Sequence, residues 1–201
     1  MILVVDHYDS FTYNLVQLIE GLGRSTEVVK SDEAPAEELV AREPEAVVLS
    51  PGPGHPANAG CFPDLLRLLP PDTPVLGVCL GHQALGVVGG ATVDRAEPFH
   101  GKASLVHHDG RGLFDGVANP FEAGRYHSLV ILRDTLPDEL RLTAWTDDGL
   151  VMATQQRDAP RFGVQFHPES ILTPEGPRIV ENFLALAGDR GVGERGRVAS
   201  R

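Results

Sequence analysis

Short apolar runs alternate with helix-like segments through the first half of the chain. Runs of four or five β-branched residues are typical of buried strands, whereas apolar residues at i, i+3, i+4 and i+7 are typical of helices that cover a sheet. The pattern predicts strands at 2–5, 26–30, 46–49 and 74–78, and helices at 11–23, 35–42, 61–69 and from Leu80 onward. Strands that alternate with helices in this way favour a parallel sheet covered on both faces.

The pattern changes in the second half, where helices become rare. Short strand-like stretches separated by turn residues predict an antiparallel extension of the sheet. They lie at 91–96, 102–108, 121–128, 141–146, 150–155 and 161–166. A last helix is expected from Pro174 to Ala187, because its apolar residues recur at helical spacing. The predicted fold class is therefore α/β, with a mixed, mostly parallel central sheet flanked by helices.

Composition and length fit a single domain. The chain has 201 residues, of which 42% are hydrophobic and 22% charged, and this is enough to bury one core. We expect one domain over 1–187 and a disordered tail over 188–201, where Gly and Arg dominate. The net charge of −11 argues against nucleic-acid and anionic-membrane partners. The first apolar run is too short for a signal peptide or a membrane span, so a cytoplasmic location is expected.

One of the two cysteines lies between two glycines at a predicted strand end. In LGVCLGHQ (76–83), Cys79 ends a buried strand and precedes a helix, with Gly77 and Gly81 two positions away on either side. This spacing is typical of a nucleophile elbow, a strained turn that holds a nucleophile up for attack and needs small flanking residues. A helix N-terminus also lowers the pKa of a neighbouring thiol. Cys61 has no such surroundings and is interpreted as a buried packing residue.

His167 is the histidine best placed to carry a proton for this thiol. It follows a strand in GVQFHPES (163–170), and Glu169 stands two positions later, so both side chains can point to the same side of the chain. Glu169 could then hold one ring nitrogen and turn the other toward Cys79. A metal site formed by these three residues and His82 is the alternative. It is disfavoured because the chain lacks paired Cys-x-x-Cys spacing, and no metal is expected.

The loop SPGPGHP (50–56) follows another predicted buried strand, so it should lie at the same sheet edge as Cys79. Its prolines remove N–H groups that a phosphate loop would need, and it lacks the ending Gly-Lys-Ser/Thr. The remaining donors can face a small anion. The backbone N–H groups of Gly54 and Leu80 therefore form a candidate oxyanion hole, which would stabilise the charge on a tetrahedral intermediate.

Six ordered segments together resemble the class I (triad) glutamine amidotransferases, and most of all the small subunits of anthranilate synthase and aminodeoxychorismate synthase. They are HYDSFTYN (7–14), SPGPGHP (50–56), LGVCLGHQ (76–83), HGKAS (100–104), RYHSL (125–129) and FHPESILT (166–173). The resemblance covers Met1 to about Ala187 and implies a flavodoxin-like sheet. The chain departs from the family at His7, where Asn is usual, and at His55, where Thr is common.

The resemblance also implies roles for individual residues. Cys79, His167 and Glu169 would form the catalytic triad. Glutamine would be held by Gln83 and by the backbone of Ser128 and Leu129. Its pocket would be lined by Gly52, Pro53 and Gly54.

The implied activity is hydrolysis of L-glutamine to glutamate and ammonia through a cysteine thioester. The chain is too short to bind a second substrate as well, so the ammonia would pass to a chorismate-using synthase subunit in a heterodimer or heterotetramer. We interpret the partner as aminodeoxychorismate synthase, of the folate branch. Anthranilate synthase, of the tryptophan branch, is the alternative. No cofactor is expected in this subunit, and Mg²⁺ is expected in the partner.

Two further hypotheses stay open. A free-standing thiol hydrolase on a similar sheet would turn over without a partner, and a non-catalytic regulatory subunit would not react with a glutamine analogue at Cys79. For the amidotransferase subunit, the segments 7–14 and 125–129 are the expected docking surface, because they are polar and aromatic and lie near the sheet edge.

Overall fold

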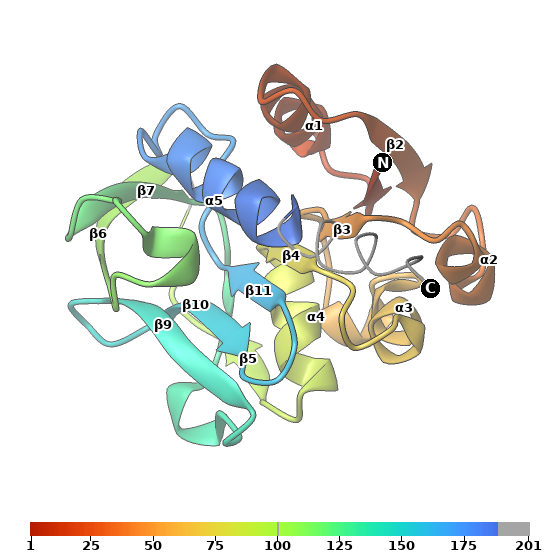
Figure 1. The fold of residues 1–201 in the computed structure, drawn as a ribbon. Coiled ribbons are helices and arrows are strands. Elements are labelled where there is room, and N and C mark those ends of the chain that lie inside the picture. The colour runs from red at the N-terminus through yellow and green to blue at the C-terminus, as the bar shows by residue number, and fades with distance from the viewer. Residues whose placement is uncertain (100, 189–201) are drawn as a thin grey trace, which may run out of the picture.

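The computed structural model describes residues 1–99 and 101–188 and has an α/β architecture (Figure 1). The strands are β1 (Ile2–Asp6), β2 (Thr26–Lys30), β3 (Ala46–Leu49), β4 (Val75–Val78), β5 (Val93–Arg95), β6 (Lys102–His108), β7 (Phe121–Arg125), β8 (Leu129–Ile131), β9 (Leu140–Thr146), β10 (Val151–Gln156) and β11 (Arg161–Val164). The helices are α1 (Thr12–Gly21), α2 (Ala36–Ala41), α3 (Phe62–Leu68), α4 (Leu80–Val88) and α5 (Gly176–Gly188). Short 3-10 turns occupy η1 (Pro56–Asn58), η2 (Gly112–Phe114) and η3 (Arg133–Thr135).

Nine strands form one sheet in the order β2-β1-β3-β4-β11-β10-β9-β6-β7. The first five are parallel, and the last four join them through antiparallel pairs. Only β10 and β6 run in the opposite direction, and the remaining seven strands of this sheet all point the same way. The expected mixed, mostly parallel sheet with an antiparallel extension is confirmed.

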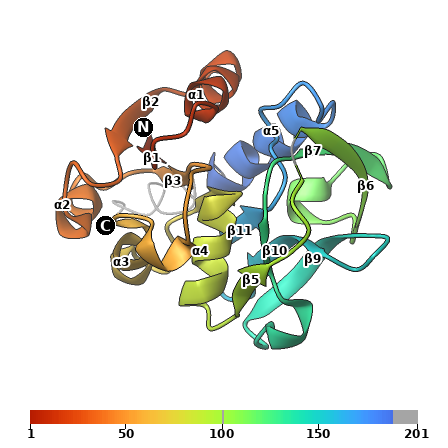
Figure 2. The same cartoon turned by 180° about the vertical axis from the view of Figure 1, so that it is seen from behind.

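The two faces of the sheet bury two separate apolar clusters, because successive side chains of a strand point to opposite faces. Ile2 and Val4 of β1 belong to the cluster that contains residues of α1 and α5. Leu3 and Val5 belong to the cluster that contains residues of α2, α3 and α4. The helices therefore cover both faces (Figures 1 and 2), as the apolar runs of the sequence predict.

A second, smaller sheet is a feature that the sequence pattern does not predict. β5 and β8 pair antiparallel, with Val93 opposite Ile131, and form a two-stranded sheet of their own. Its apolar residues pack with Leu140 and Val151 in a third cluster. The prediction that the stretch 91–96 extends the main sheet is therefore wrong. This stretch forms part of the separate two-stranded sheet.

The carboxyl ends of β1, β3, β4 and β11 meet at one edge of the sheet, because these neighbouring strands are parallel. Ligands of open α/β sheets bind at such an edge. The segments that follow these strands are those containing His7, Pro53, Cys79 and His167. The predicted tail lies, apart from Gly188, outside the described residues. Within the described residues, no helix is both long and apolar enough to cross a membrane.

Candidate active site

Cys79 lies in a strained turn between β4 and α4. Its φ of 52° and ψ of −99° place a non-glycine residue in a region that L-residues rarely adopt. The flanking glycines make this turn possible: a Cβ atom on Gly81 would lie 2.5 Å from the carbonyl oxygen of Leu49. The nucleophile elbow predicted from the spacing is therefore present in the backbone.

The turn is fixed on both sides of the thiol. The backbone N–H of Cys79 donates to the carbonyl of Val164 in β11, at 2.8 Å. The carbonyl of Cys79 accepts from the N–H of Gln83 in the first turn of α4, at 3.0 Å. The buried thiol therefore lies at the N-terminal end of α4, where the helix dipole places partial positive charge.

His167 and Glu169 form a buried pair beside the elbow. Nδ1 of His167 lies 2.7 Å from Oε1 of Glu169, and their side chains are 3% and 0% exposed. Burial lowers the pKa of His167, but its interactions with Cys79 and Glu169 outweigh burial and raise the pKa to about 10. Because Glu169 holds Nδ1, Nε2 is the ring nitrogen left to exchange a proton with Cys79. This is the orientation that the spacing of the two residues predicts.

Two aromatic rings from distant segments pack against the His167 ring. The centroids of Phe11 and Tyr126 lie 5.4 and 4.9 Å from the imidazole centroid, both edge-on. The His167 backbone is fixed as well, because its carbonyl accepts from the hydroxyl of Thr173 at 2.7 Å. The segments 7–14, 125–129 and 166–173 therefore meet at the candidate triad.

The loop that follows β3 packs directly onto the elbow. A Cβ atom on Gly52 would lie 2.7 Å from the backbone oxygen of His7 and 2.9 Å from Cδ2 of Leu80, so glycine is required there. Gly54 has a φ of 89°, which glycine adopts without strain. The structure thus brings the predicted oxyanion loop against Leu80, the residue predicted to supply the second donor. Pro53 and Gly54 are exposed, as a substrate-facing loop requires.

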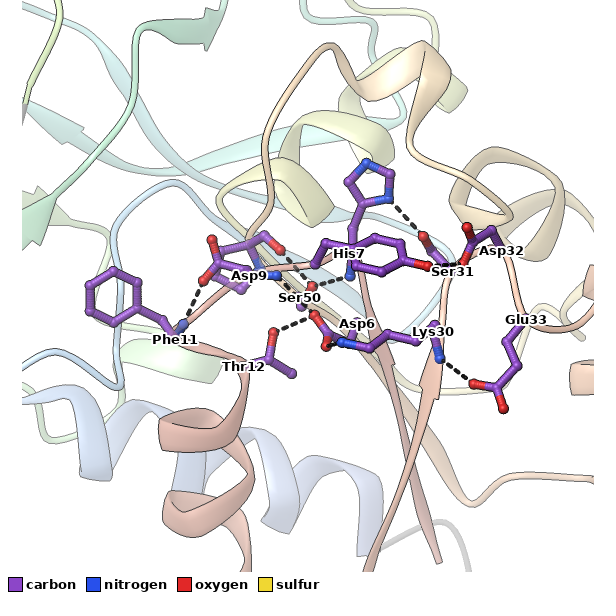
Figure 3. Close-up of polar contacts among 12 residues, drawn as sticks. Asp6, His7, Asp9, Phe11, Thr12, Lys30, Ser31, Asp32, Glu33 and Ser50 are labelled. Atoms are coloured by element: carbon purple, nitrogen blue, oxygen red, sulfur yellow. Dashed lines mark hydrogen bonds and ion pairs between the residues drawn. The ribbon is translucent and has the colours of Figure 1, made fainter.

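A polar network anchors the segment 7–14 (Figure 3). The buried carboxylate of Asp6 accepts from the hydroxyl of Thr12 at 2.8 Å and from the N–H of Asp9 at 3.1 Å, and it pairs with Lys30. Burial raises the pKa of Asp6, but its bonds to Lys30, Asp9 and Thr12 outweigh this and lower it. The carboxylate therefore stays charged and ties the start of the segment to β1 and β2.

His7, the residue that departs from the family, is part of the same network (Figure 3). Its N–H donates to Oγ of Ser50 at 2.8 Å, and its Nδ1 lies 2.7 Å from Oγ of Ser31. Ser50 begins the predicted oxyanion loop, and both the backbone and the ring of His7 lie next to Gly52. His7 therefore packs against this loop and helps to fix its position. The second departure, His55, is exposed at the far end of the same loop.

The predicted glutamine-binding residues are joined by hydrogen bonds. Nε2 of Gln83 donates to the carbonyl of Leu129 at 2.9 Å, and Nδ1 of His127 lies 3.1 Å from the same oxygen. Burial and the charge of Arg125 lower the pKa of His127 to about 3, so its ring is neutral. Because a carbonyl only accepts, Nδ1 of His127 carries the proton. The carbonyl of Leu129 is thereby held by two side chains, and Ser128 before it is exposed.

Sequence reasoning missed two polar residues of this site, His127 and Gln165. Gln165 is 0% exposed, and its Nε2 lies 3.6 Å from Sγ of Cys79. Both residues stand within or beside segments that the resemblance already singled out. Their signal was available, since a polar residue inside a predicted buried segment needs a hydrogen-bonding partner.

His82 belongs to the core and not to the site. It is fully buried, and burial lowers its pKa to about 3. A Cβ atom on Gly163 would lie 2.3 Å from its Nδ1, so the ring fills space behind β11. Among the described residues, no group of three or more His, Cys, Asp or Glu side chains is placed to hold a metal ion. The alternative that His82 completes a metal site is therefore not supported.

Comparisons with known proteins find a matching family model and similar relatives. The family model "Glutamine amidotransferase class-I" matches residues 3–187. Anthranilate synthase component 2 from Azospirillum brasilense is 50% identical, over 92% of this chain and 95% of that protein. The bifunctional protein TrpGD from Thermotoga maritima is 48% identical over 92% of this chain, which spans 32% of that protein's length. A crystal structure described as that of a GMP synthase component from Thermoplasma acidophilum has a TM-score of 0.84 and 25% identity, covering 94% of both chains.

Proposed function

The chain belongs to the class I glutamine amidotransferase family, and from this premise we propose that it is the glutaminase subunit of a chorismate-using synthase. Its substrate would be L-glutamine, and its products glutamate and ammonia. The observation that carries the proposal is the strained Cys79 elbow beside the buried pair of His167 and Glu169. A charged imidazole next to a cysteine is the arrangement that activates a thiol nucleophile.

The proposed reaction begins with attack of the Cys79 thiolate on the side-chain carbonyl carbon of glutamine. The carbonyl oxygen becomes an oxyanion, which the N–H groups of Gly54 and Leu80 would stabilise. Removing one such donor costs about 2.7–4 kcal/mol in enzymes of this general kind. His167 is protonated at neutral pH and would give its proton to the leaving nitrogen as the C–N bond breaks.

The second half of the reaction is hydrolysis of the glutamyl thioester. After giving up its proton, the neutral His167 ring would take a proton from water, which attacks the thioester carbonyl and releases glutamate. Glu169 would keep the ring in one orientation through both steps. Each step uses groups of this chain, and we assign any Mg²⁺ of the complete synthase to its partner subunit.

The hydrogen bonds around Gln83 support a specific role in glutamine binding. Its amide nitrogen donates to Leu129 and to Gln165, so the amide oxygen is the atom left for a ligand. That oxygen would accept a hydrogen bond from an N–H group of glutamine. The backbone of Ser128 and Leu129 would hold the other end of the substrate, and Gly52, Pro53 and Gly54 would line the pocket.

A partner subunit is expected to cover the edge of the sheet at which the site lies. Ammonia is mostly protonated in neutral water, so it must reach its acceptor without entering solvent. Three large apolar side chains in the segments that meet at the triad are exposed: Tyr8 and Tyr13 are each 58% exposed, and Ile171 is 95% exposed. These residues belong to segments 7–14 and 166–173, and we propose that they contact the synthase subunit.

The comparisons favour the tryptophan branch over the folate branch that the sequence interpretation preferred. Relatives of near full-length coverage are anthranilate synthase components, including the Azospirillum protein at 50% identity. We therefore propose that the ammonia serves anthranilate formation. Aminodeoxychorismate formation is the second candidate, because ammonia released at this site could serve either synthase.

The proposal is tested by reconstituting the chain with its synthase partner and supplying chorismate. Cys79→Ser should abolish product formation from glutamine and leave product formation from ammonium salts intact. Loss of both activities would contradict the division of labour, as would glutamine turnover in the variant. Identification of the aminated product then separates anthranilate from aminodeoxychorismate. Turnover of glutamine at full rate by the isolated chain would instead favour the free-standing hydrolase.

A further inference from the structure

A fully buried glutamine connects the thiol to the glutamine pocket. Gln165 follows β11 and stands two residues before His167. Its Nε2 lies 3.6 Å from Sγ of Cys79, and its Oε1 accepts from Nε2 of Gln83 at 3.0 Å. Its backbone N–H donates to the carbonyl of Met152 at 2.8 Å, so the residue is held at both its backbone and its side chain.

The hydrogen bonds allow one orientation of the two side-chain amides. The carbonyl of Leu129 can only accept, so the group of Gln83 that faces it must be the NH₂ group. The same NH₂ group faces Gln165, which must therefore present its oxygen to Gln83. The NH₂ group of Gln165 is then directed at the sulfur of Cys79. The chain of contacts thus fixes a donor next to the thiol.

We propose that Gln165 is a positioning residue that holds the Cys79 thiolate and couples it to the glutamine pocket through Gln83. This inference rests on the proposed function. An N–H donor favours a thiolate over a neutral thiol, because hydrogen bonds to charged acceptors are stronger than those to neutral ones. It also restricts the direction of the sulfur, which must approach the carbonyl carbon of the substrate along a narrow path.

Other groups that act on Cys79 are known from the structure, so the effect of Gln165 can be separated from theirs. The positive charge of His167 acts on the thiol, and Glu169 acts through His167. The nearby His127 is neutral, and the N-terminus of α4 contributes a fixed dipole. Gln165 is uncharged, so replacing it with methionine removes the hydrogen bonds and keeps both the charge and the approximate volume of the site.

The test is the pH dependence of alkylation of Cys79 by iodoacetamide in the full chain, measured peptide by peptide so that Cys61 is counted separately. We expect Gln165→Met to raise the pH midpoint of Cys79 alkylation by about one unit, the equivalent of a tenfold change in thiolate at fixed pH. With the partner present, kcat for glutamine should fall at least as much. Gln17→Met, on the exposed face of α1, makes the same replacement away from the site and should change neither value.

A second variant decides the matter if Gln165→Met does not fold. Gln165→Glu keeps an oxygen for Gln83 but replaces the donor with a second oxygen, so it should raise the midpoint further. An unchanged midpoint in either folded variant would overturn the inference. Alkylation needs no glutamine, so the two proposals can fail separately. If the midpoint moves in the variants but the wild-type protein has no glutaminase activity with its partner, the inference is supported and the proposed function is contradicted. An unchanged midpoint in an active enzyme would overturn the inference alone.

Discussion

A Cβ atom placed on Gly77 would lie 2.5 Å from the carbonyl carbon of Gly81, so the end of β4 and the first turn of α4 touch through their backbones. No real Cβ atom tolerates that distance. The approach allows Cys79, which stands between the two glycines, to adopt its positive φ. The spacing in the sequence is thus a direct consequence of close backbone packing.

We expect Gly77→Ala to lower the free energy of unfolding by about 1–3 kcal/mol and to abolish glutamine turnover. The added methyl group meets backbone atoms, which cannot rotate away as a side chain can. Denaturant unfolding and a glutaminase assay check both effects. Gly21→Ala in α1 is the matched control, because nothing lies within 4 Å of its new Cβ atom. It should be neutral or stabilising by about 0.5–1 kcal/mol. Equal stability of the two variants would contradict the account of the elbow.

Glu169→Gln should lower the pKa of His167 from about 10 and reduce kcat by about 10²- to 10⁴-fold, because the ring loses its charged partner and its fixed orientation. NMR titration of the imidazole and steady-state kinetics measure these effects. A variant with unchanged kcat would show that Glu169 does not orient the base.

The same pair predicts a pH dependence of stability. A folded pKa raised above the ordinary value of 6.5 stabilises the fold fully below about pH 6.5, and this contribution is lost as the pH rises through about 10. The wild type should therefore lose stability between these limits, and Glu169→Gln should lose less. The free energy of unfolding of both proteins is measured in urea at pH 7 and pH 10. The difference between the two proteins removes the contribution of the groups that titrate in both. Identical losses in the two proteins would contradict the raised pKa.

Ile171→Ser should weaken binding of the synthase partner by at least about fivefold, because an exposed apolar side chain beside the site would lose a buried contact. The dissociation constant can be measured calorimetrically with the intact partner. Leu68→Ser is the control. Leu68 is also exposed. It ends α3 and precedes β4, so it lies toward the amino end of that strand, whereas Cys79 follows the carboxyl end. Equal effects of the two substitutions would remove Ile171 from the docking surface.

The first half of the fold could be predicted from the sequence because its central strands β1, β3 and β4 are buried on both faces. The runs at 2–5 and 46–49 are continuous apolar segments, and they match β1 and β3 to within one residue. The pairing of β5 with β8 was not predictable from pattern alone. These strands have three residues each, and whether they extend the main sheet depends on packing against Leu140 and Val151.

The candidate triad could be predicted because its geometry is encoded locally. Gly77 and Gly81 flank the thiol at fixed spacing, and His167 and Glu169 stand two residues apart. The supporting hydrogen bonds could not be predicted in the same way, because Gln83, Gln165 and Leu129 come from three distant segments. Only the fold brings them together. The partner's identity is likewise not encoded in the triad, since released ammonia serves any acceptor.

In the proposed reaction, Cys79 forms a covalent bond with the side-chain carbon of glutamine. The most direct measurement is the mass of each cysteine peptide after incubation with a diazoketone analogue of glutamine in the presence of the partner. We predict one adduct, on Cys79, and none on Cys61, because burial raises the pKa of the Cys61 thiol to about 11. The adduct should disappear in Cys79→Ser. Absence of an adduct on Cys79, or equal labelling of both cysteines, would contradict the claim.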